Sequence, residues 1–179
     1  MKINEVKTAT WAGKVRLVKD NPKKLWEVDW NKENIKNLKN NNGRVYLITS
    51  NKKIMKIGGS QAKGGLISTI KAYQDNGLTG KPSVRTYGIH IYIYEELMKN
   101  NEVEIYMIGS KKVKGKIHGL YHETKEMMLK IDFKEIENLC KKEYKEKMGK
   151  YPDWNFQENK NTWPQRISDG RDLICKNKL

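Results

Sequence analysis

The residues best suited to chemistry in this sequence are Tyr46 and Lys56, which lie ten positions apart. Each belongs to a short strand-like segment, 44–48 and 54–58, and Ser50-Asn51-Lys52 between them is typical of a tight turn. The pattern predicts a β-hairpin that carries a phenol and an amine. Both groups can bind and release protons, but a lysine acts as a base only if burial or a neighbouring charge lowers its pKa. The alternative for Tyr46 is an ordinary strand tyrosine that packs in the core.

The sequence around this hairpin alternates between helical and strand patterns. Apolar residues recur at helical spacing from 65 to 76, and Asp132 opens a second helical stripe with a capping-box-like start. Residues 103–108 alternate as a strand does, whereas 87–99 combine both patterns, and we favour a helix there. These elements predict an α/β protein of the α+β kind, with helices flanking a small antiparallel sheet.

The two strand-like segments resemble the paired signature of the GIY-YIG nuclease superfamily. In that signature two antiparallel strands each bring one proton-handling side chain to a shared face, and a helix with further catalytic groups follows. Lys56 would replace the second tyrosine, a variant associated with small type II restriction endonucleases of the superfamily. The resemblance covers roughly residues 43–152, in the order hairpin, helix, third strand, acidic helix.

The resemblance implies a set of catalytic residues. Tyr46 and Lys56 would handle protons and orient the nucleophilic water, and Tyr73 would contact the phosphate. Glu137, in the later acidic helix, would hold the divalent metal, Mg²⁺ or Mn²⁺. The alternative for Glu137 is a solvated ion-pair partner in a lysine-rich helix.

One position departs from the superfamily pattern. The resemblance implies an arginine one helical turn before Tyr73, but Thr69 stands there. Arg85, which follows this helix, could reach back from a loop to hold the scissile phosphate. If it does not, the chain would be a slow enzyme, or a non-catalytic nucleic-acid-binding module that has lost the catalytic arginine.

The charge of the chain favours a polyanionic partner. Lys and Arg number 36 against 21 acidic residues, a formal net charge of +15, and such a field attracts nucleic acids. A lysine-rich surface from an AT-rich genome is the alternative. The basic residues Lys111, Lys112, Lys114 and Lys116 form a patch suited to backbone phosphates, or the exposed tip of a hairpin.

The carboxy-terminal region interleaves aromatic residues, amides and arginines. Trp154, Arg166 and Arg171 are of the types that stack on bases or read base edges, which predicts an arm that contacts double-stranded DNA. Its alternative is a tail whose tryptophans dock on the core. We therefore expect an accessory region over 1–42, a nuclease core over 43–152 and this arm over 153–179.

The remaining features set the cellular context. Cys140 and Cys175 lie in no metal-ligand or disulfide pattern. The amino terminus has no apolar core or cleavage site and no stretch of eighteen apolar residues occurs, so we expect a cytoplasmic protein.

The sequence as a whole predicts a Mg²⁺-dependent DNA endonuclease. Its first interpretation is a type II restriction endonuclease, which would act on a palindromic target as a homodimer because such a target has two-fold symmetry. A phage or homing-type nuclease of the same superfamily is the alternative within the class.

Overall fold

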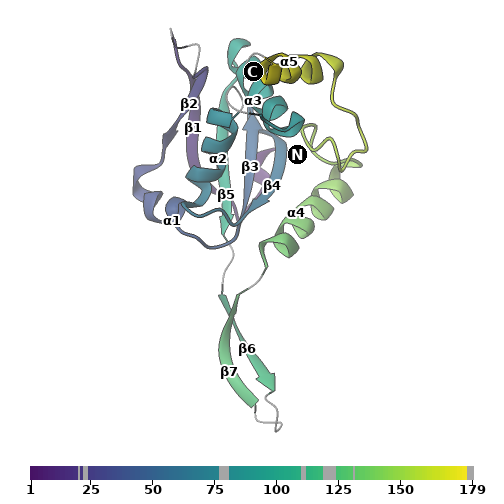
Figure 1. Cartoon of the computed structure of the whole chain (residues 1–179). Helices are drawn as coiled ribbons and strands as arrows, with labels where there is room; N and C mark the ends of the chain where they lie inside the picture. Colours follow the sequence, from purple (N-terminus) through teal and green to yellow (C-terminus); the bar gives the residue numbers. More distant parts are fainter. Residues whose placement is uncertain are drawn as a thin grey trace.

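The computed structural model describes residues 1–19, 21, 24–76, 81–109, 112–118, 124–130 and 132–176. Five strands form one antiparallel sheet in the order β2-β1-β5-β3-β4, and β6 and β7 form a separate ribbon. The chain is therefore an α+β protein, which confirms the fold class predicted from its sequence (Figure 1). In chain order the elements are η1 (Ile3–Glu5), β1 (Thr10–Leu17), β2 (Trp26–Trp30), η2 (Lys32–Asn34), α1 (Ile35–Lys39), β3 (Arg44–Ser50), β4 (Lys53–Ser60), α2 (Gly65–Asn76), α3 (Val84–Met98), β5 (Val103–Gly109), β6 (Lys112–His118), β7 (Thr124–Lys130), α4 (Phe133–Met148) and α5 (Gln165–Lys176).

The predicted hairpin is formed by β3 and β4, and its register fixes which side chains share a face. Tyr46 lies opposite Gly58, and Lys56 lies opposite Ile48. Directly opposed residues point the same way, as do residues two apart on one strand, so Tyr46 and Lys56 belong to one face of the sheet. A side chain at Gly58 would overlap the ring of Tyr46. Glycine at this position therefore allows the phenol to lie across β4.

Local signals explain the ends of several elements. Asn51 and Lys52 turn the hairpin with φ values of 46° and 66°, the left-handed geometry that matches the twist of paired strands. Asp132 caps α4 by accepting a hydrogen bond from the backbone N–H of Lys134 (3.0 Å). Gly149 ends the same helix with a φ of 75°. The predicted helices over 65–76 and 87–99 are also confirmed, as α2 and as most of α3.

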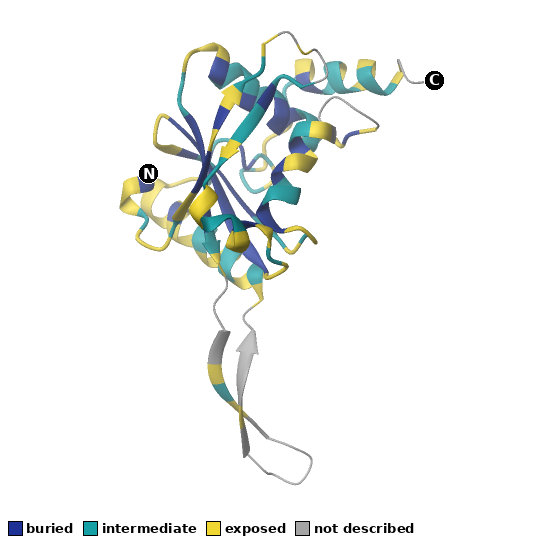
Figure 2. Cartoon of the chain, turned by 90° about the vertical axis from the view of Figure 1, so that its left-hand side faces the viewer, coloured by how far each residue is buried: buried dark blue, intermediate teal, exposed yellow. Residues whose placement is uncertain are grey.

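Each face of the sheet carries its own core. On the face of Tyr46, apolar residues of α2 and α3 such as Leu66 and Ile93 are fully buried. On the opposite face Val45 and Leu47 pack with Tyr144 of α4. Figure 2 shows the resulting buried layer along the strands. All seven residues of β3 are buried, and each large apolar side chain among them contributes about 1.5–3 kcal/mol to stability. This strand is therefore a rigid base for Tyr46.

Residues 1–42 extend the same sheet. β1 pairs with β5, and β2 pairs with β1 at the sheet edge. Trp26 of β2 is fully buried, and its indole donates a hydrogen bond to the backbone carbonyl of His90 in α3 (3.2 Å). The amino-terminal strands thus support α3. The division of the chain into three functional regions stays a prediction.

The β6–β7 ribbon points away from the five-stranded sheet (Figure 1). Its register pairs Lys112 with Lys130 and His118 with Thr124. Among its lysines, Lys114 and Lys116 are exposed, whereas Lys111 lies outside the described residues. No helix within the described part of the chain is long and apolar enough to cross a membrane.

Candidate active site

Four polar side chains from four elements meet on the α2 and α3 face of β4. They are Tyr46 of β3, Lys56 of β4, Tyr73 of α2 and Arg85 of α3. The hydroxyls of Tyr46 and Tyr73 are 2.7 Å apart and hydrogen-bonded, and both interact electrostatically with the Arg85 guanidinium. Tyr46 is 1%, Lys56 3% and Tyr73 8% exposed. We call these four residues the buried cluster.

Arg85 reaches the buried cluster from a helix and not from a loop. It lies in the first turn of α3, two residues after the cap residue Ser83, whose hydroxyl accepts a hydrogen bond from the backbone N–H of Thr86 (3.1 Å). Arg85, Thr69 and Tyr73 all line one open hollow of about 420 Å³. The hollow therefore contains a guanidinium, which α3 supplies. Helix α2 contributes Thr69, at the position where the resemblance implies an arginine.

Burial and charge set the protonation of the buried cluster. Burial, reinforced by the positive charge of Arg85, lowers the pKa of Lys56 to about 7. Burial also raises the pKa of Tyr46 well above its ordinary value, and the contact with Tyr73 adds to this. Near neutral pH, Tyr46 therefore keeps its proton, while Lys56 is poised between its charged and neutral forms. An amine in this state can accept a proton from a nearby water.

Glu137 approaches β4 from the opposite face. Its carboxylate lies against Gly59, where a side chain on residue 59 would overlap the oxygen Oε2. Gly58 and Gly59 are successive residues of β4, so their missing side chains face opposite sides. Because the two glycines have no side chains, Tyr46 can lie against the strand on one face and Glu137 can lie against it on the other. The negative charge of Glu137 nevertheless acts to raise the pKa of Lys56, less than that of Glu158 does.

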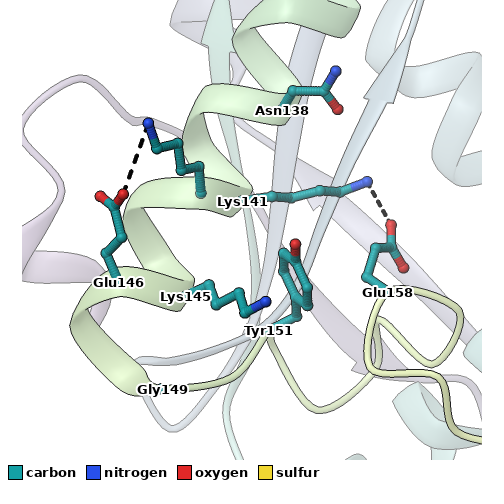
Figure 3. Close-up of a pocket in the computed structure, with 8 residues that line it drawn as sticks. Asn138, Lys141, Lys145, Glu146, Gly149, Tyr151 and Glu158 are labelled. Atoms are coloured by element: carbon teal, nitrogen blue, oxygen red, sulfur yellow. Dashed lines mark hydrogen bonds and ion pairs between the residues drawn. The ribbon is translucent and has the colours of Figure 1, made fainter.

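Glu137 is linked to a second carboxylate through a lysine. Lys141 Nζ lies 2.6 Å from Glu137 Oε1 and 2.5 Å from Glu158 Oε1 (Figure 3 shows the contact with Glu158). The three side chains are 14–28% exposed, with Glu158 the most open. Glu158 also acts on Lys56 and opposes the lowering of its pKa. We call these three residues the carboxylate relay.

The donors present fit a magnesium-like ion. Mg²⁺ is commonly held by one or two carboxylates, with waters and substrate phosphate oxygens completing its shell. Glu137 offers such a carboxylate at the edge of the buried cluster, with Glu158 nearby. No group of three or more His, Cys, Asp or Glu ligands occurs among the residues that the structure describes. The chain thus suits a metal that depends on substrate for part of its coordination.

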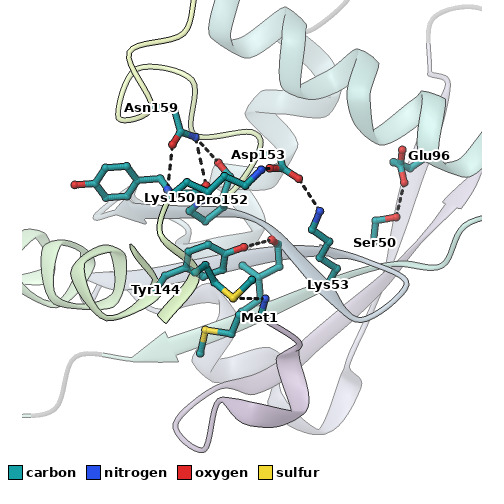
Figure 4. Close-up of polar contacts among 12 residues, drawn as sticks. Met1, Ser50, Lys53, Glu96, Tyr144, Lys150, Pro152, Asp153 and Asn159 are labelled. Carbon is teal, nitrogen blue, oxygen red and sulfur yellow. Dashed lines mark hydrogen bonds and ion pairs between the residues drawn. The ribbon is translucent and has the colours of Figure 1, made fainter. Parts of the chain in front are cut away.

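The segment after α4, residues 150–164, is fastened to β4, and we call it the connecting segment. Asp153 is paired with Lys53 at the start of β4 and with Lys150, both at 2.7 Å (Figure 4). The Asn155 amide accepts a hydrogen bond from the backbone N–H of Ile57 and donates one to its carbonyl, both at 2.9 Å. The connecting segment thus pairs with the free edge of β4 beside Lys56.

Sequence reasoning missed three residues at this site: Lys141, Asn155 and Glu158. Lys141 follows Glu137 by four residues, the spacing of an ordinary ion pair on a helix surface. Asn155 and Glu158 lie far along the chain from β4, within a stretch interpreted as DNA-contacting. The i,i+4 pair was the one available signal, and it carries little information because such pairs are common.

The predicted DNA-contacting residues fall into two groups. Trp154 is 5% exposed and stacks on Tyr92 at 5.8 Å between ring centroids. Arg166 pairs with Glu95, and Arg171 donates a hydrogen bond to the Pro82 carbonyl (2.9 Å). These contacts within the chain match the docking alternative for the arm. Lys114 and Lys116, by contrast, are exposed on the ribbon, which also contains Lys112.

Comparison with a solved structure supports this architecture. No protein family model matches the chain, and no curated protein sequence matches it significantly. A mutant of bacteriophage T4 EndoII has a similar structure, with 16% sequence identity and a TM-score of 0.57 over 87% of this chain and 99% of that one. The restriction endonuclease HPY188I in complex with product DNA is similar over 85% of this chain and 84% of that one, with 21% identity and a TM-score of 0.45. At these identities the similarity to EndoII establishes a shared fold.

Proposed function

We propose that this chain is a divalent-metal-dependent DNA endonuclease of the GIY-YIG type. The main support for the proposal is the buried cluster of Tyr46, Lys56, Tyr73 and Arg85, together with the Glu137 carboxylate on the opposite face of β4, whose charge acts on Lys56. Hydrolysis of a phosphodiester needs an activated water, a cation at the phosphate and a group that helps the leaving oxygen depart. The chain has residues suited to the first two needs, and a cation held by Glu137 would meet the third.

Each residue of the buried cluster has a distinct proposed role. Neutral Lys56 accepts the proton of the attacking water, because its lowered pKa leaves much of it uncharged near neutral pH. Tyr46, which keeps its proton, orients that water through its hydroxyl. Arg85 and Tyr73 hold the scissile phosphate from the open hollow, and the charge of Arg85 stabilises the anionic transition state. A divalent cation at Glu137 would add Lewis-acid stabilisation of the phosphate and leaving oxygen.

The finer assignment is a type II restriction endonuclease that cuts double-stranded DNA as a homodimer with Mg²⁺ or Mn²⁺. The basic ribbon would reach along the duplex and contact backbone phosphates through Lys114 and Lys116. The fold shared with EndoII supports the alternative of a phage-type nuclease equally well. The non-catalytic alternative rested on the arginine missing at Thr69, and the presence of Arg85 beside Tyr73 weakens it.

The test is incubation of the purified protein with phage DNA and Mg²⁺, resolved on a gel. Discrete bands would identify a restriction enzyme, a smear a nuclease of low specificity, and a mobility shift without cutting a binder. Glu137→Gln should abolish cleavage and retain DNA binding, because it removes a metal ligand but no cation that contacts phosphate. Cutting at a normal rate by this variant would overturn the assignment of Glu137.

A further inference from the structure

The carboxylate relay contains a cation of its own at the place proposed for the metal. The ammonium of Lys141 lies between Oε1 of Glu137 and Oε1 of Glu158, at 2.6 and 2.5 Å. The Lys141 and Glu137 side chains are only 14% and 16% exposed, so water screens this charge less than that of a surface ion pair. Lys141 therefore interacts strongly with the carboxylate that is the proposed metal ligand.

The other oxygen of Glu137 faces the strand. Oε2 lies against the backbone of Gly59, where even a methyl group would overlap it. The same position is crowded by the ring of Phe133. A divalent cation bound to Glu137 must then share the carboxylate with the Lys141 ammonium or displace it. Two cations on one half-buried carboxylate repel each other.

Glu158 gives Lys141 an alternative partner. It lies in the connecting segment and already contacts the ammonium, so Lys141 can lose Glu137 and remain paired (Figure 3). Lys142, the next residue on α4, differs in this respect. It is 72% exposed and has Glu146 at 3.8 Å, so its charge points to solvent and away from the relay.

We propose that Lys141 competes with the divalent cation for Glu137, and that Glu158 acts as the positioning residue that takes up Lys141 when the cation binds. This inference rests on the proposed function, since it assumes that Glu137 holds the metal. It predicts that removing the charge of Lys141 tightens metal binding. It also predicts that removing the charge of Glu158 weakens metal binding only while Lys141 is present. Glu158 is not itself a ligand in this proposal.

The experiment measures Mn²⁺ binding to the full chain without DNA, from the loss of the free Mn²⁺ signal in electron paramagnetic resonance. Lys141→Met should tighten binding at least about tenfold, equivalent to about 1.4 kcal/mol. Lys142→Met is the matched control, since it removes the same charge one residue away, and it should change binding by less than about threefold. Lys141→Gln keeps a polar side chain and replaces Lys141→Met if the latter fails to fold.

The role of Glu158 is separated from metal ligation by a double-mutant cycle. Glu158→Gln alone should weaken Mn²⁺ binding at least about threefold, because Lys141 then relies on Glu137 alone. In the Lys141→Met background the same change should have an effect of less than about twofold. A loss that persists in that background would make Glu158 a direct ligand and overturn the positioning role.

Two further outcomes distinguish failure of the inference from failure of the proposed function. The first outcome is that Glu137→Gln abolishes Mn²⁺ binding but Lys141→Met tightens it no more than Lys142→Met does. This outcome overturns only the proposed competition between Lys141 and the cation. Mn²⁺ binding that survives Glu137→Gln moves the metal away from this carboxylate, and it overturns the proposed metal site together with the inference.

Discussion

The two faces of β4 carry two differently built halves of the same site. On one face Tyr46, Lys56 and Tyr73 are at most 8% exposed and sit among packed apolar side chains of α2 and α3. On the other face Glu137 and its partners are 14–28% exposed and held by ion pairs. Each half lies against a glycine of the same strand, Gly58 on one face and Gly59 on the other.

The difference shows that two physical effects, burial and charge balance, set the charge states of the side chains on the two faces. Burial sets the protonation of the first half, because the core around it disfavours charge on Lys56 and Tyr46. Charge balance sets the second half, because Glu137 is paired with the Lys141 ammonium, which we propose that a divalent cation displaces. The first half should therefore be insensitive to ionic conditions, and the second should respond to them.

The largest expected effect comes from the proton-handling pair on the buried face. Tyr46→Phe and Lys56→Met should each lower the cleavage rate about a hundredfold or more, the scale of a positioned acid–base group. Both variants keep side-chain volume, so packing should survive. The measurement is single-turnover cleavage of phage DNA at saturating Mg²⁺.

Thermal unfolding of the same two variants is the control. If they unfold at much lower temperature and show no specific rate defect in the folded fraction, Tyr46 and Lys56 are packing residues only. The contrast between the two faces would then have no catalytic meaning.

The next effect concerns the arginine that joins the buried cluster from α3. Arg85→Ala should slow cleavage at least about tenfold, because the transition state gathers negative charge that a metal and Lys56 only partly offset. Thr69→Arg in the same chain should restore part of the loss, since residues 69 and 85 line one hollow. Cleavage that is unchanged in Arg85→Ala would exclude this arginine from the reaction.

A smaller effect is expected in the pH dependence of stability. Lys56 has a pKa of about 7 in the folded chain and about 10.4 when unfolded. Between these values the unfolded chain binds the extra proton, so the free energy of unfolding should rise with pH, by up to about 1.4 kcal/mol per unit. Below pH 7 this contribution is absent because both states are protonated.

Lys56→Met removes this titration and isolates it. Urea unfolding of the wild type and the variant at pH 7, 8 and 9 should give a difference in unfolding free energy that grows with pH in favour of the wild type. A difference that stays constant would mean that Lys56 is not desolvated in the folded protein.

The smallest effect is expected outside both faces, on the ribbon. Lys114→Gln with Lys116→Gln should weaken DNA binding and lower the slope of log K against log salt by about two, roughly one for each lost phosphate contact. The cleavage rate of bound DNA should not change. A matched pair at Lys134 and Lys142, on the exposed side of α4, should leave the slope nearly unchanged if the ribbon is the contact.

Local signals made much of the fold predictable from the sequence. The turn at Asn51 and Lys52 and the cap at Asp132 each depend on neighbouring residues, and both occur as predicted. The order of the sheet was not predictable. It depends on pairs such as Val15 with Val103, which lie far apart in the chain and leave no periodic pattern.

The candidate site divides in the same way. Tyr46 and Lys56 share a face because of the hairpin register, which the sequence indicates. The helical position of Arg85 follows from a cap at Ser83, a residue that was interpreted as part of a loop. Glu158 and Asn155 reach β4 only through tertiary packing of the connecting segment, so no local pattern marks them.

The hydrogen bonds between Asn155 and Ile57 have a consequence for synthesis in the cell. These residues are 98 positions apart, and a ribosome that adds about 5–20 residues per second needs roughly 5–20 seconds to cover that distance. During this interval a nascent chain has made its hairpin but not the segment that encloses Lys56. Any activity that depends on this closed arrangement would therefore begin only after the connecting segment has been made and has packed on β4.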